Sequence, residues 1–386
     1  MTENIKQRAA LSVYFLLSGF CFASWASRIP TIKMIYDLND AELGNLLLIL
    51  PISSLLSLPI SGWLVSKFDS RLPLIVSFSL FSIALALIGL SNSLWILSIA
   101  LFLFAFNMRI INISINTQSL TVQKGFPKKI IGSFHGIWSG GGLLGVGFST
   151  LMVKTDVLVA THLMSVGLFS LVISFIAYPF LLKNDKSPHG NKLILGKPDK
   201  TIMLLGLIIF FAAVCEGGMF DWSGVYFKEV VKEEIFTLGY LIFILFMTLS
   251  RFFSDKLMDY IGMKKLYILS SVFISSGILT AIIFPYFWPA LIGFSIVGIG
   301  VAAIFPMTYM LAGTSKKYSP GMAISIITTY AIAGMLVGPP LLGYIAHTFN
   351  LKMSFLLFVF SGLMFIPISQ LFFKLKEEQS EGKQGL

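Results

Sequence analysis

The sequence predicts an all-α integral membrane protein with twelve transmembrane helices in two pseudo-symmetric six-helix bundles. Composition, apolar runs and an internal repeat support this fold class. Of the 386 residues, 56% are apolar and only 12% are charged, roughly half the charged share of a soluble domain. The chain therefore has too few charged residues for an ordinary soluble surface.

Twelve apolar runs are each long enough to cross a hydrocarbon core of about 30 Å. The first lacks a small-residue cleavage site before Arg28, so we interpret it as a helix and not as a cleaved signal peptide. The runs lie near 9–29, 43–65, 72–91, 94–118, 130–153, 158–182, 201–222, 236–253, 266–285, 288–312, 322–345 and 353–373.

The two halves repeat at an offset of 193 residues, half the length of the chain. Gly141 and Gly145 recur as Gly334 and Gly338, and the loop Lys124-Gly-Phe-Pro127 recurs as Lys317-Tyr-Ser-Pro320. One offset that aligns separate local patterns indicates two copies of one architecture. Parallel half-repeats of apolar helices are typical of transporters.

The repeat sets the expected domain organisation. We expect an N-terminal bundle over 1–182, a polar cytoplasmic linker over 183–200, a C-terminal bundle over 201–373 and a disordered cytoplasmic tail over 374–386. None of the predicted external loops is long enough for a soluble catalytic domain.

The chain has a net charge of +10, and its basic residues are distributed unevenly among the loops. With the N-terminus inside, twenty Lys and Arg residues fall in cytoplasmic segments, and external loops hold five: Lys33, Lys154, Lys228, Lys232 and Lys352. This positive-inside pattern places both termini in the cytoplasm and directs the excess charge to anionic lipids. We therefore expect no nucleic-acid partner.

No motif for catalysis or cofactor binding is found in the sequence. Cys21 and Cys215 lie in apolar runs without metal-ligand spacing, so neither a disulfide nor a metal site is expected. The chain has no phosphate-binding loop, hydrolase elbow or zinc motif. We expect no cofactor and no enzymatic activity, and any transport must use an ion or solute gradient.

Two loops resemble the signature of the major facilitator superfamily, Gly-x-x-x-Asp-Arg-x-Gly-Arg-Arg. The first copy runs from Gly62 to Arg71, with Ser66 at the usual Asp, and the second keeps Asp259 but has Asp255 at the first glycine. The resemblance covers the whole chain and implies gating through these loops. The residues it assigns to loop gating are Gly62, Lys67, Asp69, Arg71, Arg251, Asp255, Asp259, Gly262 and Lys264. For Arg251, one turn from Asp255 and two from Asp259, local support of the loop is favoured over substrate binding.

Several further motifs resemble the YbjJ-like transporters of bacteria. They are Trp25-Ala-Ser-Arg28-Ile-Pro30, Asn116-Thr-Gln118, Ser133-Phe-His135-Gly-Ile-Trp138, Glu216-Gly, Asp221-Trp222 and Gly338-Pro-Pro-Leu-Leu-Gly343. This resemblance implies a multi-pass protein of the bacterial inner membrane. Its pattern often has acidic residues around the fourth helix, where this chain has Asn112 and Gln123.

Ionisable residues inside apolar helices are costly and mark candidate functional positions. Arg28 and Asp221 are equivalent under the repeat offset. The superfamily resemblance implies that their helices meet across a central cavity, so we predict that the two residues face each other as an external gate. Glu216 lies about 7.5 Å deeper, at ~1.5 Å per residue, and is the first candidate for a coupling proton site. A permanent bridge between Arg28 and a carboxylate is the alternative.

The fourth apolar run carries a polar stripe. Arg109, Asn112 and Asn116 follow spacings of three and four, which place them along one helix face. The stripe predicts a water-filled cavity suited to an anionic solute, because arginine offers a two-pronged donor. Hydrogen bonding between helices is the alternative.

Aromatic residues and a histidine accompany these groups. His135 and Trp138 share a helix face beside a glycine cluster and are candidate substrate contacts. Trp25, Trp222 and Tyr226 lie beside the predicted gate, where they would close over a substrate or anchor the helices at the membrane interface.

The sequence favours a secondary transporter that works by alternating access, with proton-coupled symport of a small polar or anionic solute. Proton-driven efflux and a membrane sensor that binds a ligand without moving it are the alternatives. The expected partners are the solute, protons and membrane lipids, and we expect a monomer.

Overall fold

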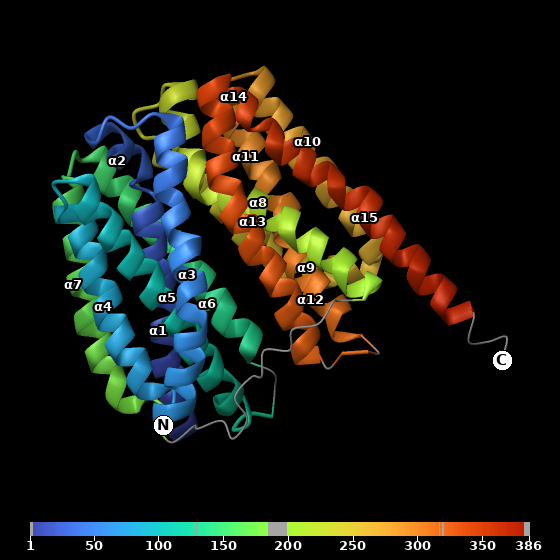
Figure 1. Ribbon diagram of the computed structural model, residues 1–386, viewed down its shortest axis with the longest axis horizontal. Coiled ribbons are helices and arrows are strands. Elements are labelled where there is room, and N and C mark those ends of the chain that lie inside the picture. Colours follow the sequence, from blue (N-terminus) through green and yellow to red (C-terminus); the bar gives the residue numbers. More distant parts are fainter. Residues whose placement is uncertain (1–2, 128–129, 184–198, 316, 319, 382–386) are drawn as a thin grey trace. The chain divides into compact units, whose positions relative to one another are not determined.

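A computed structural model of the chain describes residues 3–127, 130–183, 199–315, 317–318 and 320–381 (Figure 1). Most of the predicted linker, 184–198, and the end of the predicted tail, 382–386, lie outside the described residues. For a few helical residues, Asp255 among them, the side chain is also outside the description.

The described chain is built from helices, with no strand among its residues. The twelve-helix, all-α prediction is confirmed. The elements are α1 (Glu3–Ala26), α2 (Ile29–Ile35), α3 (Asp40–Phe68), α4 (Arg71–Leu90), α5 (Leu94–Gln123), α6 (Ile131–Lys154), α7 (Val159–Ala177), η1 (Tyr178–Phe180), α8 (Lys200–Tyr226), η2 (Phe227–Val231), α9 (Thr237–Ile261), α10 (Met263–Ile283), α11 (Phe287–Ala302), α12 (Ile304–Gly313), α13 (Pro320–Thr348), α14 (Leu351–Ser354) and α15 (Leu356–Glu381).

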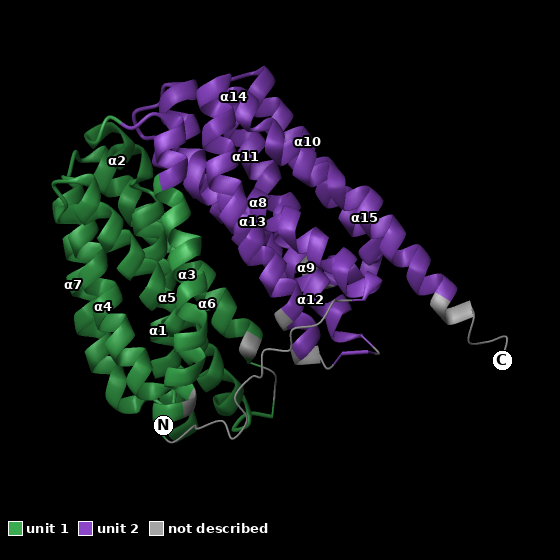
Figure 2. Cartoon of the chain, viewed as in Figure 1, with its two compact units in different colours: residues 1–37, 46–194 green, residues 38–45, 195–386 purple. Residues whose placement is uncertain are grey.

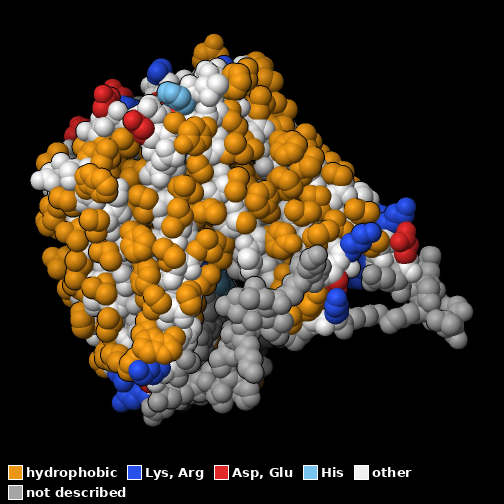
Figure 3. All heavy atoms as spheres, viewed as in Figure 1, with side chains coloured by type: hydrophobic (Ala, Val, Ile, Leu, Met, Phe, Trp, Pro, Cys, Tyr) orange, Lys and Arg blue, Asp and Glu red, His pale blue; other side chains and the backbone are white. Residues whose placement is uncertain are grey.

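Eleven helical segments of the described chain are long and apolar enough to cross a membrane, and Thr237–Phe253 in α9 is a shorter apolar one. Consecutive elements combine in some spans, as α11 and α12 do in Phe287–Gly313. On the face in Figure 3, hydrophobic side chains cover the helices of each unit, and charged side chains gather near helix ends. This distribution fits helices whose sides face lipid.

The chain forms two compact units (Figure 2). Unit 1 comprises Met1–Asp37 and Leu46–Ile194, and unit 2 comprises Leu38–Asn45 and Leu195–Leu386. The sequence did not indicate that the start of α3 belongs to unit 2. A Cβ atom on Gly44 would lie 3.0 Å from the Pro339 carbonyl oxygen of α13, so the start of α3 packs backbone to backbone within unit 2.

The second unit also continues further than the sequence suggested. Helix α15 extends to Glu381 and so includes residues 374–381 of the stretch that we expected to be disordered. Lys374 and Glu378 lie four residues apart in this polar segment, a spacing at which opposite charges stabilise an exposed helix. At the other end, α8 starts at Lys200 because the Asp199 carboxylate accepts a hydrogen bond of 2.8 Å from the Ile202 amide.

The helices recur at the offset found in the sequence. Helix α5 starts at Leu94 and α11 at Phe287, 193 residues later. The repeated glycines have one role in both units, which is close helix contact. A Cβ atom on Gly141 would overlap the Leu16 carbonyl oxygen of α1, and one on Gly334 would overlap the Phe210 carbonyl oxygen of α8. The glycines thus let α6 approach α1 in unit 1, and α13 approach α8 in unit 2.

Replacing Gly141 tests this contact. We expect Gly141→Val to lower the melting temperature of the purified protein, because overpacking at a backbone contact costs about 1–3 kcal/mol or more. Gly140→Val is the matched control, since a Cβ atom at Gly140 has no atom within 4 Å. Equal melting temperatures for the two variants would contradict the packing.

Candidate functional site

Helix α5 holds the predicted polar stripe in unit 1. Arg109, Asn112 and Asn116 are all half-buried. Arg109 Nε donates a hydrogen bond of 2.7 Å to Ser54 Oγ on α3, and Asn116 Nδ2 donates one of 2.7 Å to the Asn112 carbonyl oxygen. The stripe therefore contains an arginine whose side chain is oriented by a neighbouring helix.

Serines hold α3 against α5 next to this arginine. Ser57 Oγ donates to the Phe106 carbonyl oxygen at 2.8 Å, and Ser53 Oγ donates to the Phe102 carbonyl oxygen one turn away. Helix α3 also contains Pro51, which removes an intrahelical hydrogen bond. The serine contacts hold the interrupted helix in register with the stripe.

Arg28 is buried in unit 1, with 4% of its surface exposed. Its Nε donates to His162 Nδ1 at 3.0 Å, and its terminal nitrogen donates to the Val157 carbonyl oxygen at 2.8 Å. A guanidinium group can only donate, so Nδ1 must accept and the imidazole proton must lie on Nε2. His162 Nε2 is 3.4 Å from Ser149 Oγ, so the proton points to Ser149.

This chain of contacts fixes the charge of the histidine. A protonated imidazole would have no acceptor for the Arg28 hydrogen, and it would add a second positive charge beside the guanidinium. The geometry thus requires a neutral His162 with one defined tautomer. Ser149 completes the chain by donating to the Gly145 carbonyl oxygen at 2.7 Å.

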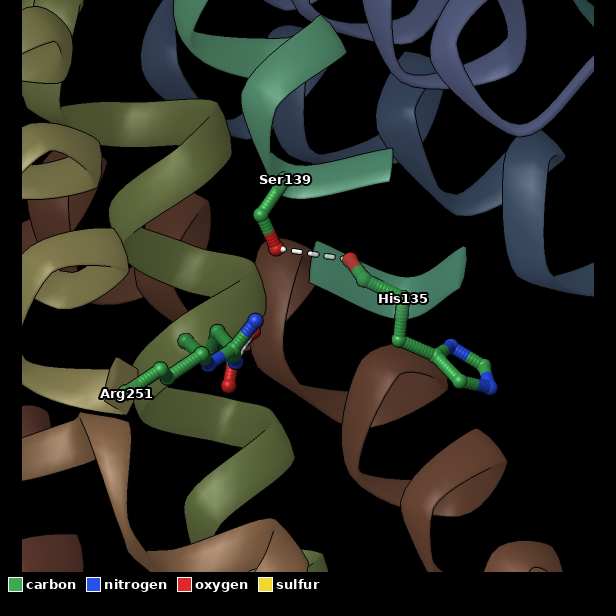
Figure 4. Close-up of polar contacts among 4 residues, drawn as sticks. His135, Ser139 and Arg251 are labelled. Atoms are coloured by element: carbon green, nitrogen blue, oxygen red, sulfur yellow. Dashed lines mark hydrogen bonds and ion pairs between the residues drawn. The ribbon is translucent and has the colours of Figure 1, made fainter. Parts of the chain in front are cut away.

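Helix α6 carries His135 and Trp138. His135 is exposed and its ring meets Phe15 edge to face at 5.7 Å. Figure 4 shows this ring turned away from Ser139, whose hydroxyl donates to the His135 carbonyl oxygen at 3.2 Å. Trp138 is half-buried beside Phe22. The substrate contacts expected of both residues stay predictions.

Glu216 on α8 forms an ion pair with Arg251 on α9 in unit 2. Arg251 donates through a terminal nitrogen to Glu216 Oε1 at 2.9 Å, the dashed contact beside the labelled Arg251 in Figure 4. Glu216 is 8% exposed. Its second oxygen, Oε2, is buried and has no hydrogen-bond partner among the described residues. A buried carboxylate with one unmatched oxygen is a candidate proton site.

The other candidates on α8 differ in exposure. Asp221 is half-buried, and Trp222 is fully buried, as is Trp25 on α1. The Tyr226 hydroxyl donates to the Ala281 carbonyl oxygen of α10 at 2.7 Å. Tyr226 therefore ties α8 to α10, and its predicted substrate contact is not tested.

The first signature loop has structural contacts. Asp69 has a φ of 65° and its carboxylate accepts from the Arg71 amide at 2.9 Å, which caps the start of α4. Arg71 lies over the Tyr178 ring at 4.3 Å, and Lys67 lies over the Trp63 ring at 4.6 Å. A Cβ atom on Gly62 would meet nothing within 4 Å, so packing does not explain this glycine.

The second signature loop depends on Gly262. Its φ of 80° joins α9 to α10, a conformation that favours glycine. Asp259 and Lys264 are exposed, and the Asp255 side chain is outside the described residues. The gating roles of both loops stay predictions.

Sequence reasoning missed three features of these sites. His162 was not singled out, although an ionisable residue in an apolar run is itself a signal. Ser54 was not identified as the partner of Arg109. Glu216 was not identified as a partner of Arg251, and the predicted support of the loop by Arg251 is not tested. Partners on different helices depend on helix rotation, which residue spacing within one helix does not give.

These units define a polytopic membrane protein with buried charges in its helices, the class to which transporters belong. The Major Facilitator Superfamily model matches residues 10–274 and 209–386. The chain therefore belongs to the major facilitator superfamily.

Relatives and solved structures agree with this assignment. The chain is 30% identical over 354 residues to an uncharacterized MFS-type transporter of Yersinia pestis, covering 91% of this chain and 92% of the relative. It is 29% identical to the membrane protein MosC of Rhizobium meliloti, covering 96% and 91%. The fold is similar to the nucleoside transporter NupG, with a TM-score of 0.78, 12% identity and coverage of 96% and 100%. A bacterial homolog of the human lysosomal transporter Spinster gives a TM-score of 0.72 at 14% identity, covering 97% and 98%.

The Arg28 contact gives a stability prediction. His162→Phe removes the acceptor of a buried guanidinium hydrogen, so we expect it to destabilise the protein by about 1–3 kcal/mol, measured as a fall in melting temperature. Ser149→Ala keeps the acceptor and is the matched control. The contact is refuted if His162→Phe melts at or above the temperature of Ser149→Ala.

Proposed function

We propose that this chain is a proton-coupled symporter of a small polar or anionic solute that works by alternating access. The observation that carries the proposal is Glu216, a buried carboxylate near the middle of the span Lys200–Val231. One of its oxygens accepts from Arg251, and the other has no hydrogen-bond partner in the part of the chain that the structure describes. Protonation would neutralise this carboxylate in the membrane interior, where charge is costly.

The polar stripe of unit 1 supports the solute class. Arg109 is oriented by Ser54 and lies on the same helix as Asn112 and Asn116, all half-buried. Such a stripe suits a hydrated solute with acceptor groups, and anions in particular. Asp221 and Arg28 remain the proposed external gate, and Trp25, Trp222 and His135 the proposed solute contacts.

Orientation and location belong to the same proposal. The distribution of Lys and Arg supports cytoplasmic termini in a bacterial inner membrane. The motifs around Arg28, His135 and Glu216 support a place among the YbjJ-like transporters. Relatives that are transporters by name support a transporting role over a purely sensory one.

A ligand screen tests the function. Purified protein is melted with sugars, nucleosides, amino acids, peptides and organic acids at pH 5.5 and 7.5, and a ligand of the folded state should raise the melting temperature. We expect a pH-dependent hit that is lost in Glu216→Gln and in Arg109→Ala. Glu378→Gln, which removes an exposed carboxylate at the end of α15, should keep the hit.

Uptake into proteoliposomes then separates transport from binding alone. A solute found in the screen should accumulate when the outside is more acidic than the lumen. Hits confined to lipophilic cations and indifferent to both substitutions would contradict symport and favour efflux, and ligand binding without counterflow would indicate a sensor.

A further inference from the structure

We infer that Arg28 is the centre of an anion-binding site in unit 1, and that its ligand is a small monovalent anion, either chloride or the carboxylate group of a solute. Two neighbouring donors, the indole of Trp25 and the hydroxyl of Thr31, complete the site. The inference goes beyond the proposed gate role of Arg28, because an anion can bind here without proton coupling and without transport.

Arg28 is a buried cation without a carboxylate partner among the described residues of unit 1. It is 4% exposed, and both of its acceptors, His162 Nδ1 and the Val157 carbonyl oxygen, are neutral. The described carboxylates nearest to these residues in the sequence, Asp37 and Asp156, are exposed, and neither forms an ion pair with Arg28. A buried charge without an opposing charge is strongly disfavoured, so the guanidinium needs an anion from outside unit 1.

The guanidinium is oriented, but its donors are only partly used. Nε donates to His162 at 3.0 Å and Nη2 donates to Val157 at 2.8 Å, while Nη1 has no acceptor among the described residues. An arginine side chain carries further N–H donors beyond the two that these contacts use. His162 and Val157 thus fix the direction of the group and leave its remaining hydrogens for a ligand.

Two further donors flank Arg28 and also lack a partner. Trp25 Nε1 and Thr31 Oγ1 are buried atoms without a hydrogen-bond partner in the described part of the chain. Trp25 precedes Arg28 by three residues, and Thr31 follows it by three. The Arg28 amide donates to the Trp25 carbonyl oxygen and the Ile32 amide to the Arg28 carbonyl oxygen, both at 2.9 Å. Side chains three positions apart on helical turns are neighbours, so each donor lies next to Arg28.

The chemistry of these donors selects an anion. An indole N–H and a guanidinium can only donate, and a hydroxyl can donate as well, so the ligand must supply acceptors. A water molecule would satisfy some of the hydrogens but not the charge. Because the hydrogen bond from Arg28 requires a neutral His162, the site carries a single positive charge and takes a monovalent anion. The low exposure of Arg28 favours a small one.

Equilibrium dialysis of the purified protein tests the site directly. The probes are radiolabelled chloride, formate and acetate, with acetamide as the neutral counterpart of acetate. Ionic strength is held constant with sodium sulfate, whose divalent anion exceeds the charge of the site. We expect saturable binding in which chloride and the carboxylates compete with each other, and no competition from acetamide.

Variants assign the anion to its donors. Arg28→Gln removes the charge and should abolish binding. Trp25→Phe removes one N–H and keeps an aromatic ring, so we expect the Kd of the anion to rise about 10-fold or more, the usual effect of losing a hydrogen bond to a charged group. Trp95→Phe is the matched control, since Trp95 is 82% exposed at the start of α5, and it should bind as the wild type does.

The melting temperature gives a readout that a merely structural role of Trp25 would not move. The smaller ring of Trp25→Phe lowers the baseline by itself, so the rise caused by sodium formate is compared and not the baseline. A bound anion stabilises the folded state in proportion to its affinity. We therefore expect a smaller rise in Trp25→Phe than in Trp95→Phe at the same formate concentration.

Competition identifies the source of the anion. A solute from the ligand screen that displaces labelled chloride, and whose amide does not, binds Arg28 through its own carboxylate. A solute that binds without displacing chloride leaves the site to chloride. Either result supports the site.

Several results would overturn the inference. It is wrong if the wild type binds no labelled anion saturably, if acetamide competes as well as acetate, or if Trp25→Phe leaves both the Kd and the formate response unchanged. Binding that appears only in Asp221→Asn also overturns it, since a carboxylate of the protein then occupies Arg28. The wild-type titration needs no variant, so a folding defect in Arg28→Gln does not weaken the test.

Uptake separates this inference from the proposed function. The dialysis needs no gradient and no membrane. If no solute accumulates in proteoliposomes although the anion binds, the proposed function fails and the anion site stands. If a solute accumulates on the pH gradient but no anion binds, the symporter stands and the anion site is refuted.

Discussion

The cost of an unmatched charge inside the membrane constrains every ionisable residue of this protein. Three of the buried or half-buried arginines show how the chain meets it, and each does so within its own unit. Arg28 donates hydrogen bonds to a neutral imidazole and to a backbone carbonyl oxygen. Arg109 donates to a serine hydroxyl, and Arg251 forms an ion pair with a carboxylate. Only the third partner can itself lose its charge by taking up a proton.

That difference separates the roles of the arginines. A guanidinium held by a carbonyl and an imidazole keeps its charge and its place, so Arg28 is a fixed cation within unit 1. A guanidinium held by a carboxylate has a partner whose strength depends on protonation. The Glu216 and Arg251 pair is therefore the proposed site of proton coupling, and the second carboxylate oxygen of Glu216 has no hydrogen-bond partner among the described residues.

The fold was largely predictable and the contacts of the site were not. Apolar runs and the offset of 193 residues gave the helices and the matched glycines, because both are periodic along the chain. Glu216 and Arg251 are 35 positions apart in the sequence and lie on two different helices. Their pairing depends on how each helix is rotated about its own axis. The contact of Asp69 with the start of α4 could not be predicted either. It requires a left-handed backbone conformation at Asp69, which the loop signature does not specify.

The two units share their packing but not their chemistry. The offset carries Gly141 onto Gly334 and keeps the close helix contact, whereas it carries Ala23 onto Glu216 and Leu58 onto Arg251. Unit 1 thus has apolar residues where unit 2 has its ion pair, and His162 corresponds to the buried Phe355. Glycine contacts are needed in both copies because each bundle packs its helices through them, whereas the proposed proton coupling needs only one titratable pair. Divergence at these polar positions makes the two copies of a repeated scaffold chemically different.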